Sequence, residues 1–220
     1  MLDGRILLDL PPTTVPQLHR LGIDFAAIEH VLISHLHADH MFGLPFFLLE
    51  YCVRLERDNP LVIAGPRGIE EVTLDLCELA WPQMRKTGFE PRLPIEFVEI
   101  PEEGEYAAGG LTFQAIPMDH FDLEAFGFRF TYKGRTIAYS GDTGECEQLD
   151  RLLDDTDVAI LELTHPQAST DPGHMDAPTF ERIAKRLVEQ GAAVIATHMS
   201  ATPDPIPGVE ICEDGKTYWI

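Results

Sequence analysis

The sequence is poor in basic residues. Its 220 residues include 16 Lys and Arg against 37 Asp and Glu, which gives a formal net charge of −21. No run of Lys or Arg interrupts this acidic balance. The average field of such a protein repels a polyanion unless a basic patch or bound cations reverse the sign locally. The charge therefore indicates solubility, or a site that binds cations, and disfavours a basic nucleic-acid-binding face.

Clustered cysteines and long apolar runs are also missing. The four cysteines, at 52, 77, 146 and 212, form no CxxC pair, so neither a cysteine zinc site nor a dense disulfide framework is indicated. We expect buried free thiols in a reducing cytoplasm. No stretch of about 18 apolar residues predicts a transmembrane helix. The N-terminus, MLDGRILLDLPP, lacks the basic-then-apolar profile of a signal peptide.

Strand-like and helix-like segments alternate along the chain, which predicts an α/β fold. Apolar residues make up 45% of the sequence, enough for a substantial core. No linker, repeat or low-complexity tract divides it, so we expect one domain over residues 1–220. The apolar patterns predict strands at 5–10, 28–35, 59–65, 158–163 and 192–198, helices at 44–56, 66–79, 145–153 and 179–190, a β region from 89 to 117, and hairpins at 126–142 and 209–220.

The segment SHLHADH at 34–40 concentrates side chains that bind metals. In extended backbone, residues i and i+2 point the same way, so His35 and His37 can reach one cation together. A turn at Ala38 then aims Asp39 and His40 at a second cation. Imidazole and carboxylate ligands suit Zn²⁺ best, with Mn or Fe also possible.

Further candidate ligands follow predicted strands later in the chain. These are His120, Asp142 and His198. Loops at strand ends are where ligand sites collect in layered α/β folds. Together with the first motif they provide enough ligands for two metals about 3.5–4 Å apart, as in hydrolytic two-metal sites. His19, His30 and His165 are interpreted as surface or capped residues.

SHLHADH, SGDT at 140–143 and THMS at 197–200 together resemble the metallo-β-lactamase superfamily. The resemblance covers nearly the whole chain and implies a four-layer αββα sandwich of two sheets between helices. It also implies that His35, His37 and His120 hold one Zn²⁺. Asp39, His40 and His198 would hold the second, and Asp142 would bridge the two.

Within the superfamily, the chain is most similar to the ribonuclease Z and phosphodiesterase branch. FGFRF at 126–130, LELTHP at 161–166 and GHM at 173–175 resemble segments of that branch. The likeness implies a proton-handling pair of Glu162 and His174, and Asp39, Glu162 and His174 are the expected catalytic residues. An imidazole oriented by a carboxylate suits protonation of a leaving oxygen. As alternatives, Glu162 is a salt-bridged carboxylate and His174 a loop residue.

The sequence departs from this branch in three places. Only 21 residues separate His120 from Asp142, where members that process tRNA insert a long arm. HMSATP at 198–203 lacks the Arg-Tyr that follows the last histidine in the family. The chain also starts inside what resembles the third strand, so we expect the usual first strands to be missing, which would expose a sheet edge to a second subunit.

These patterns predict a metal-dependent hydrolase that uses a hydroxide bound by two zinc ions to cleave a small or cyclic phosphodiester. The alternatives are an ester, thioester or lactone hydrolase on the same site, an iron-dependent persulfide-oxidising enzyme, and a non-catalytic binding protein. The last alternative is a tRNA 3′-processing endonuclease, which the net negative charge and the short segment between His120 and Asp142 disfavour. We expect no membrane partner and a homodimer. Met41, Phe42, Phe46 and Phe121 are interpreted either as the lining of an apolar pocket beside the metals or as core residues.

Overall fold

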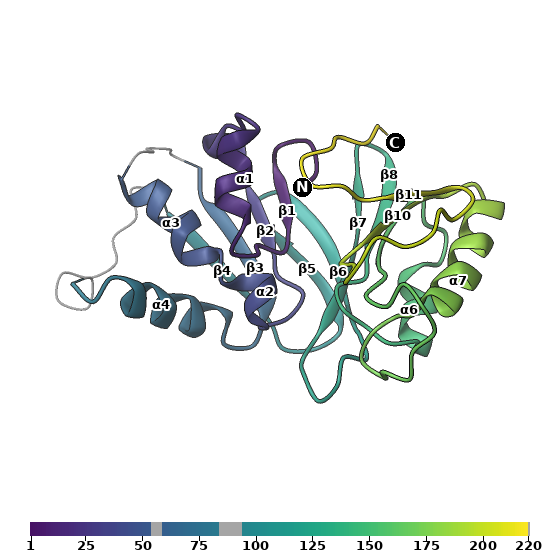
Figure 1. Ribbon diagram of the computed structural model, residues 1–220. Coiled ribbons are helices and arrows are strands. Elements are labelled where there is room, and N and C mark those ends of the chain that lie inside the picture. The colour runs from purple at the N-terminus through teal and green to yellow at the C-terminus, as the bar shows by residue number, and fades with distance from the viewer. Residues whose placement is uncertain (54–58, 84–93, 220) are drawn as a thin grey trace. The chain divides into compact units, whose positions relative to one another are not determined.

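The chain forms two compact units. The computed structural model describes residues 1–53, 59–83 and 94–219 (Figure 1). The first unit comprises residues 1–101 and 107–111, and the second comprises 102–106 and 112–220. A single domain over residues 1–220 stays a prediction. Among the described helices, none combines the length and apolarity that crossing a bilayer would require.

The first unit contains a four-stranded parallel sheet in the order β1-β2-β3-β4. Its strands are β1 (Ile6–Leu8), β2 (His30–Leu32), β3 (Leu61–Pro66) and β4 (Ile95–Ile100). Its helices are α1 (Thr14–Arg20), the short 3-10 helix η1 (Phe25–Ala27), α2 (Ala38–Met41), α3 (Leu44–Val53) and α4 (Ile69–Ala80). A parallel sheet brings the carboxyl ends of neighbouring strands to one edge, and this property places the candidate ligands that follow β2.

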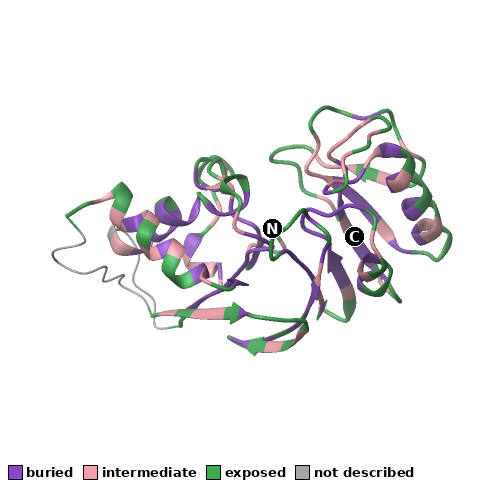
Figure 2. Ribbon diagram, turned by 90° about the horizontal axis from the view of Figure 1, so that it is seen from below, coloured by how far each residue is buried: buried purple, intermediate pink, exposed green. Residues whose placement is uncertain are grey.

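The core of the first unit is aromatic where α3 meets the chain around η1. Phe47 and Tyr51 lie one helical turn apart on α3 and are fully buried. The Phe25 and Phe47 rings are 5.9 Å apart between centroids, and the Tyr51 hydroxyl donates to the Phe25 carbonyl at 2.7 Å. Burying each such ring contributes roughly 1.5–3 kcal/mol, so this contact anchors α3. In the first unit, buried positions fill β2 and β3, whereas β4 and the helices also carry exposed residues (Figure 2).

The second sheet has seven strands in the order β11-β10-β9-β8-β7-β6-β5. β8 to β11 run parallel to one another, whereas β6, β7 and β8 are antiparallel neighbours. The strands are β5 (Gly104–Ala108), β6 (Leu111–Pro117), β7 (Phe126–Tyr132), β8 (Arg135–Tyr139), β9 (Val158–Glu162), β10 (Ala193–Thr197) and β11 (Val209–Ile211). The predicted hairpin at β7–β8 is confirmed. Its turn residues Lys133 and Gly134 have φ of 50° and 76°, as a type I′ turn requires.

Two helices complete the second unit: α6 (Glu147–Leu152) and α7 (Ala177–Glu189). Asp176 caps α7, because its carboxylate accepts the Thr179 backbone N–H at 3.0 Å. Phe180 and Leu187, two turns apart on one face of α7, are buried against the apolar residues of β9 and β10. Gly191 ends the helix with a φ of 90°. The helix was predicted at 179–190, so the Asp176 cap and the first two helical residues, Ala177 and Pro178, were missed.

The predicted hairpin at 209–220 is wrong. β11 pairs in parallel with β10, and the described residues that follow it form no strand. The Tyr218 hydroxyl instead donates to the Ile211 carbonyl at 2.8 Å and accepts the Glu213 backbone N–H at 2.9 Å. The segment after β11 is therefore held against β11 by the Tyr218 side chain and not by backbone pairing of two strands. The predicted helix at 44–56 and the β region from 89 extend into residues outside the described ranges, and α1 and α2 were not predicted. Absence of the family's first strands stays a prediction.

Candidate metal centre

The polar residues of the second unit gather at one edge of its sheet. Asp142 follows β8, Glu162 ends β9 and His198 follows β10, three strands that run in parallel. His120 follows β6, which has the same direction because two antiparallel pairings separate it from β8. Strand direction alone therefore brings the four side chains to a common edge.

This edge carries two overlapping groups of potential ligands. The ligand atoms of His120, Asp142 and His174 lie within 4.8 Å of one another, and so do those of Glu162, His174 and His198. The His198 Nε2 lies 3.4 Å from Asp142 Oδ2. His120, Asp142 and Glu162 are almost fully buried. His198 has a φ of 52°, in the left-handed region that histidine adopts more readily than most residues.

Glu162 is a fully buried carboxylate that the protein supplies with several donors. Its Oε1 accepts the Thr143 backbone N–H at 2.7 Å and lies 3.1 Å from His174 Nδ1. Its Oε2 accepts the Thr164 hydroxyl at 2.5 Å and the Thr164 backbone N–H at 3.1 Å. Donors of this number satisfy a buried carboxylate and fix its direction.

His174 and His198 are both oriented by the network around Glu162. The hydrogen bond to Glu162 raises the pKa of His174, and burial of the ring opposes that shift. The Thr164 hydroxyl, which donates to Glu162, lies 2.8 Å from His198 Nδ1. The two imidazole rings stack with centroids 5.7 Å apart and an angle of 11°. Thr164 thus links the predicted proton donor to a predicted ligand.

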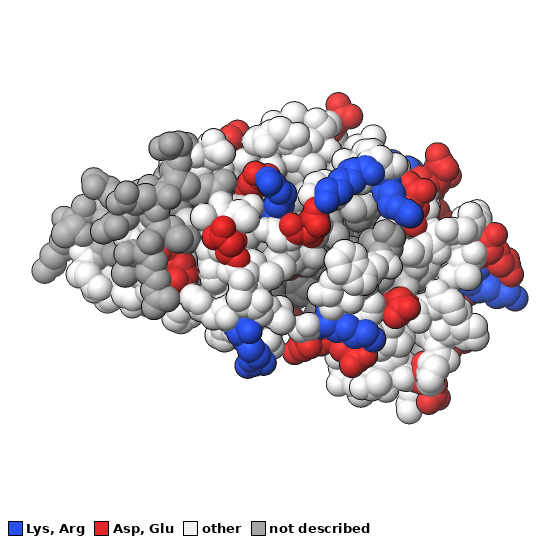
Figure 3. Space-filling model, turned by 90° about the horizontal axis from the view of Figure 1, so that it is seen from above, with Lys and Arg blue, Asp and Glu red and all other residues white. Residues whose placement is uncertain are grey.

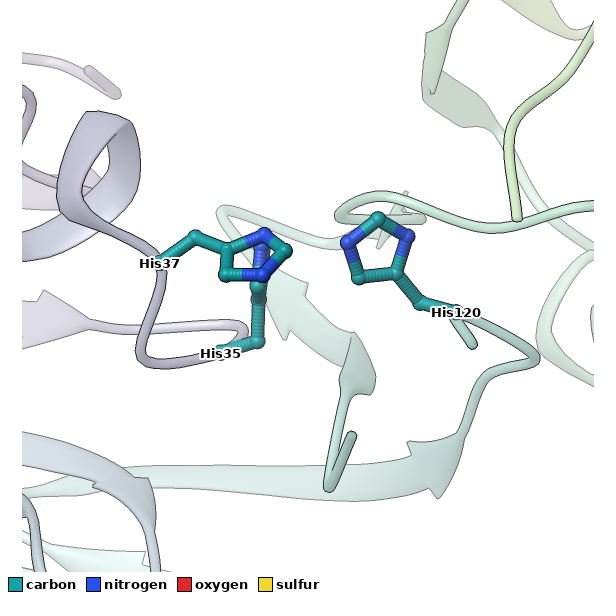
Figure 4. Close-up of side chains that lie close together, drawn as sticks. All are labelled: His35, His37 and His120. Carbon is teal, nitrogen blue, oxygen red and sulfur yellow. The ribbon is translucent and has the colours of Figure 1, made fainter. Parts of the chain in front are cut away.

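His120 is held by the loop that precedes α7. Its Nδ1 donates to the Gly173 carbonyl at 2.8 Å. This hydrogen bond fixes the orientation of the ring and leaves Nε2 as the nitrogen that can bind a metal. A carbonyl can only accept, so the contact sets the tautomer of His120. Figure 4 shows His120 on the chain that leaves β6.

The predicted ligands of the first unit occupy one loop and the start of α2. His35 lies in the loop after β2, and His37 occupies the N-cap position of α2 without a side-chain capping hydrogen bond (Figure 4). The rings of His35 and His40 are 4.1 Å apart between centroids, and those of His35 and His37 are 4.7 Å apart. The Asp39 carboxylate, 66% exposed, lies 3.6 Å from His40 Nε2. The four side chains of the motif therefore lie close together, and their division between two cations stays a prediction.

Asp9 is the residue that organises this loop, and the sequence interpretation missed it. It follows β1, is 5% exposed and has a φ of 56°. Its carboxylate accepts the Ser34 backbone N–H at 2.7 Å and the Ser34 hydroxyl at 2.8 Å. The same carboxylate lies 2.7 Å from His40 Nδ1, and Ser34 Oγ lies 3.0 Å from His35 Nδ1. An acidic residue within the apolar stretch ILLDL was the available signal.

The donor set fits divalent metals. His35, His40, His120 and His198 each have Nδ1 within hydrogen-bond distance of a hydroxyl, carboxylate or carbonyl. A metal-binding histidine is usually held in this way at one nitrogen while the other binds the metal. Imidazoles and carboxylates without thiolates favour zinc, manganese or iron.

Other residues singled out in the sequence lie elsewhere. Met41 is fully buried and belongs to the core of the first unit. Phe42, Phe46 and Phe121 are exposed by 42%, 52% and 52%. The three histidines that were interpreted as surface or capped residues have different environments. His19 is exposed and pairs with Glu50, His165 pairs with Asp171, and His30 is buried with Nε2 3.1 Å from the Ala108 carbonyl. None of the four cysteines, all of them among the described residues, forms a disulfide, and Cys77 is the buried one.

The chain belongs to the family described as the beta-lactamase superfamily domain, which matches residues 4–199. Among its relatives is a ribonuclease Z of Ignicoccus hospitalis, 28% identical over 89% of this chain and 78% of that protein. A ribonuclease Z of Staphylococcus epidermidis is 32% identical, but over 56% of this chain and 38% of that protein.

Solved structures share the fold. Human tRNase Z, short form, aligns over 98% of this chain and 88% of its own with a TM-score of 0.77 and 22% identity. A diphosphatase of the PhnP family aligns over 98% and 80% with a TM-score of 0.72 and 21% identity. The predicted metallo-β-lactamase fold and resemblance are confirmed, and the protein is a metal-dependent hydrolase. The expectation that tRNA is not its substrate gains no support, because relatives are named ribonuclease Z.

Proposed function

We propose that this protein hydrolyses a small or cyclic phosphodiester with the help of two Zn²⁺ ions. The observation that carries the proposal is the pair of Glu162 and His174. A buried carboxylate lies 3.1 Å from an imidazole whose pKa is raised, and the same imidazole lies 3.9 Å from Asp142 Oδ2. A proton donor beside carboxylate and histidine ligands is what cleavage of a phosphate ester requires.

The ligands follow the family pattern in this proposal. His35, His37 and His120 hold the first metal. Asp39, His40 and His198 hold the second, and Asp142 serves both. When bound, the metal pair supplies a nucleophilic water at neutral pH and neutralises negative charge on the phosphate.

The residues around His174 move the proton. Its Nδ1–H donates to Glu162, so the proton available to a leaving oxygen is the one on Nε2. The raised pKa of His174 increases the fraction of imidazolium at neutral pH, which suits a general acid. Glu162, which accepts four hydrogen bonds, stabilises the charged ring. Asp39, in the first turn of α2, is the third expected catalytic residue.

The preference for a small substrate rests on charge and on chain length. In the second unit Arg151, Arg182 and Arg186 each pair with an acidic side chain. On the face drawn in Figure 3, Lys and Arg side chains lie close to Asp and Glu. The residues between His120 and Asp142 include the whole β7–β8 hairpin, which leaves little chain for an RNA-binding arm. A compact diester needs neither feature.

A precursor tRNA is the second candidate, favoured by the name of the relatives. The Ignicoccus hospitalis protein called ribonuclease Z aligns with 89% of this chain. An acidic protein can still accept RNA where bound cations reverse the local charge.

Metal analysis coupled to a substrate panel tests the proposal. The protein, purified without chelator, is assayed on bis(p-nitrophenyl) phosphate, 2′,3′-cyclic AMP, a 3′-extended tRNA and a lactone panel. We expect about two zinc ions per chain and turnover of the first two. His174→Ala is expected to lower kcat by about 10²–10⁴-fold, the usual contribution of a general acid. His19→Ala, at an exposed histidine, is the matched control.

The other results would select among the alternatives. Turnover of lactones, esters or thioesters alone would replace the phosphodiesterase proposal. Iron as the only bound metal, with oxidation of a persulfide, would favour the redox enzyme. Cleavage of the extended tRNA without turnover of small diesters would favour the endonuclease, and metal-loaded protein inactive on every substrate would favour a binding protein. Sedimentation of the same sample tests the predicted homodimer.

A further inference from the structure

Phe121 presents an exposed aromatic ring next to the histidines of the second unit. The residue directly follows His120, and its ring centroid lies 4.9 Å from the His120 ring and 5.8 Å from the His174 ring. The ring stands edge-on to His174, at 78°. It is 52% exposed, so burial does not explain why a large apolar side chain stands here.

The backbone and the neighbouring loop also hold this ring in place. Phe121 has a φ of 54°, in the left-handed region that costs an L-residue free energy and that bulky residues seldom adopt. Its ring covers Gly173, where an added Cβ would lie 2.5–2.7 Å from three ring atoms. A side chain at position 173 would therefore displace the ring. Unfavourable backbone geometry and an exposed ring at one residue are typical of a functional position.

We propose that Phe121 is a stacking platform for an aromatic group, such as a nucleobase, on the leaving side of the substrate. This inference rests on the proposed function. A leaving oxygen that receives the His174 proton lies about 3 Å from that ring. The substituent on the oxygen then extends past Phe121, whose centroid is 5.8 Å from the His174 ring. Aromatic side chains stack on any nucleobase, because every base has a π-face.

Binding of two phosphate monoesters tests the platform without any turnover, because each is a truncated substrate analogue that keeps only the phosphate and the leaving substituent. Equilibrium dialysis measures AMP and ribose 5-phosphate on the zinc-loaded protein. We expect AMP to bind more tightly than ribose 5-phosphate. Phe121→Ala should lower the affinity for AMP by about 5- to 100-fold, the range for loss of one stacked base. Ribose 5-phosphate affinity should not change. Phe121→Trp should restore AMP binding, whereas Leu123→Ala, at an exposed apolar residue of the same loop, is the control.

Equal affinity of the wild-type protein for AMP and ribose 5-phosphate would overturn the platform, as would an unchanged AMP affinity in Phe121→Ala. Failure to bind either ligand would overturn it as well. Absence of phosphodiester turnover, with the expected difference in AMP binding, would overturn the proposed function and leave the platform standing.

A separate set of contacts concerns Asp171. One oxygen of its carboxylate accepts the Gly173 backbone N–H at 3.0 Å, and the other lies 3.0 Å from His165 Nε2. His165 is itself held by its backbone, which donates to the Met175 carbonyl at 3.1 Å. The Gly173 carbonyl accepts from His120 Nδ1 at 2.8 Å. One residue, Gly173, thus connects Asp171 to a predicted metal ligand.

We infer that Asp171, paired with His165, is a positioning residue for His120. Its carboxylate fixes the Gly173 amide, and the Gly173 carbonyl fixes the ring of His120. Partners of this kind set the tautomer and direction of a metal ligand, and their loss usually weakens metal binding by about 10- to 100-fold. This inference also rests on the proposed metal centre.

Zinc affinity, measured by competition with a chelator, tests this role. Asp171→Ala is expected to lower the zinc affinity by about 10- to 100-fold. Asp171→Asn should restore most of that affinity, because the amide oxygen still accepts the Gly173 N–H. Asp204→Ala, at an exposed acidic residue, is the control. Nitrogen-15 NMR of His120 in the metal-free protein gives a second readout. Unchanged zinc affinity in Asp171→Ala, or an unchanged His120 tautomer, would overturn the inference even if the wild-type protein hydrolysed no diester.

Discussion

Glu162→Gln removes one charge from a fully buried site while keeping the shape of the side chain. Glu162 accepts four hydrogen bonds, two at each carboxylate oxygen. An amide offers only one acceptor, and its NH₂ group must face the donors at the other position. The Thr164 hydroxyl can rotate and accept, but the Thr164 backbone N–H cannot. One buried donor is then orphaned, which costs about 1–3 kcal/mol of the free energy of unfolding.

Urea unfolding of the metal-free protein measures this cost. With an m-value of about 2–3 kcal/mol per molar, the midpoint should fall by roughly 0.3–1.5 M. Glu103→Gln is the matched control, because Glu103 is 44% exposed and pairs with Arg151 at the surface. Exposed pairs contribute about 0–1 kcal/mol. A midpoint for Glu162→Gln that falls no further than that of Glu103→Gln would refute the reasoning.

Three further predictions concern other parts of the molecule. Gly144→Ala should lower the free energy of unfolding by about 1–3 kcal/mol in a urea titration, because an added Cβ would lie 1.9 Å from the Pro172 carbonyl oxygen and backbone would have to move. Burial raises the pKa of Cys77 to about 12, so this thiol should resist an alkylating reagent up to about pH 9 in the native protein, as peptide mapping after labelling would show. Asp9→Ala should lower the zinc affinity by about 10- to 100-fold in chelator competition, because His40 loses the carboxylate that lies 2.7 Å from its Nδ1.

Each of these has a contrary outcome. A Gly144→Ala protein as stable as the wild type would show that the loop relaxes at no cost. Labelling of Cys77 at the rate of a free thiol would show that the first unit opens readily. Unchanged zinc affinity in Asp9→Ala would show that His40 needs no partner.

The sequence by itself determined the features that depend on local pattern. Alternating aromatics around a Lys-Gly turn are sufficient for the β7–β8 hairpin, because the residues that must pair lie close along the chain. The same holds for α7, whose apolar residues recur at helical spacing. SHLHADH also carries its own geometry, so the neighbourhood of His35, His37 and His40 was predictable.

Only the tertiary structure decided which distant residues meet. Parallel strands pair across long connections, so their partners are absent from any local window. This is why β11 was assigned to a hairpin, and why Asp9, which reaches Ser34 and His40 from the end of β1, escaped notice. The exposure of Phe121 and the support of His120 by Gly173 likewise depend on side chains that packing brings together. Residue type indicates what chemistry a side chain can do, and packing decides which partner holds it in place.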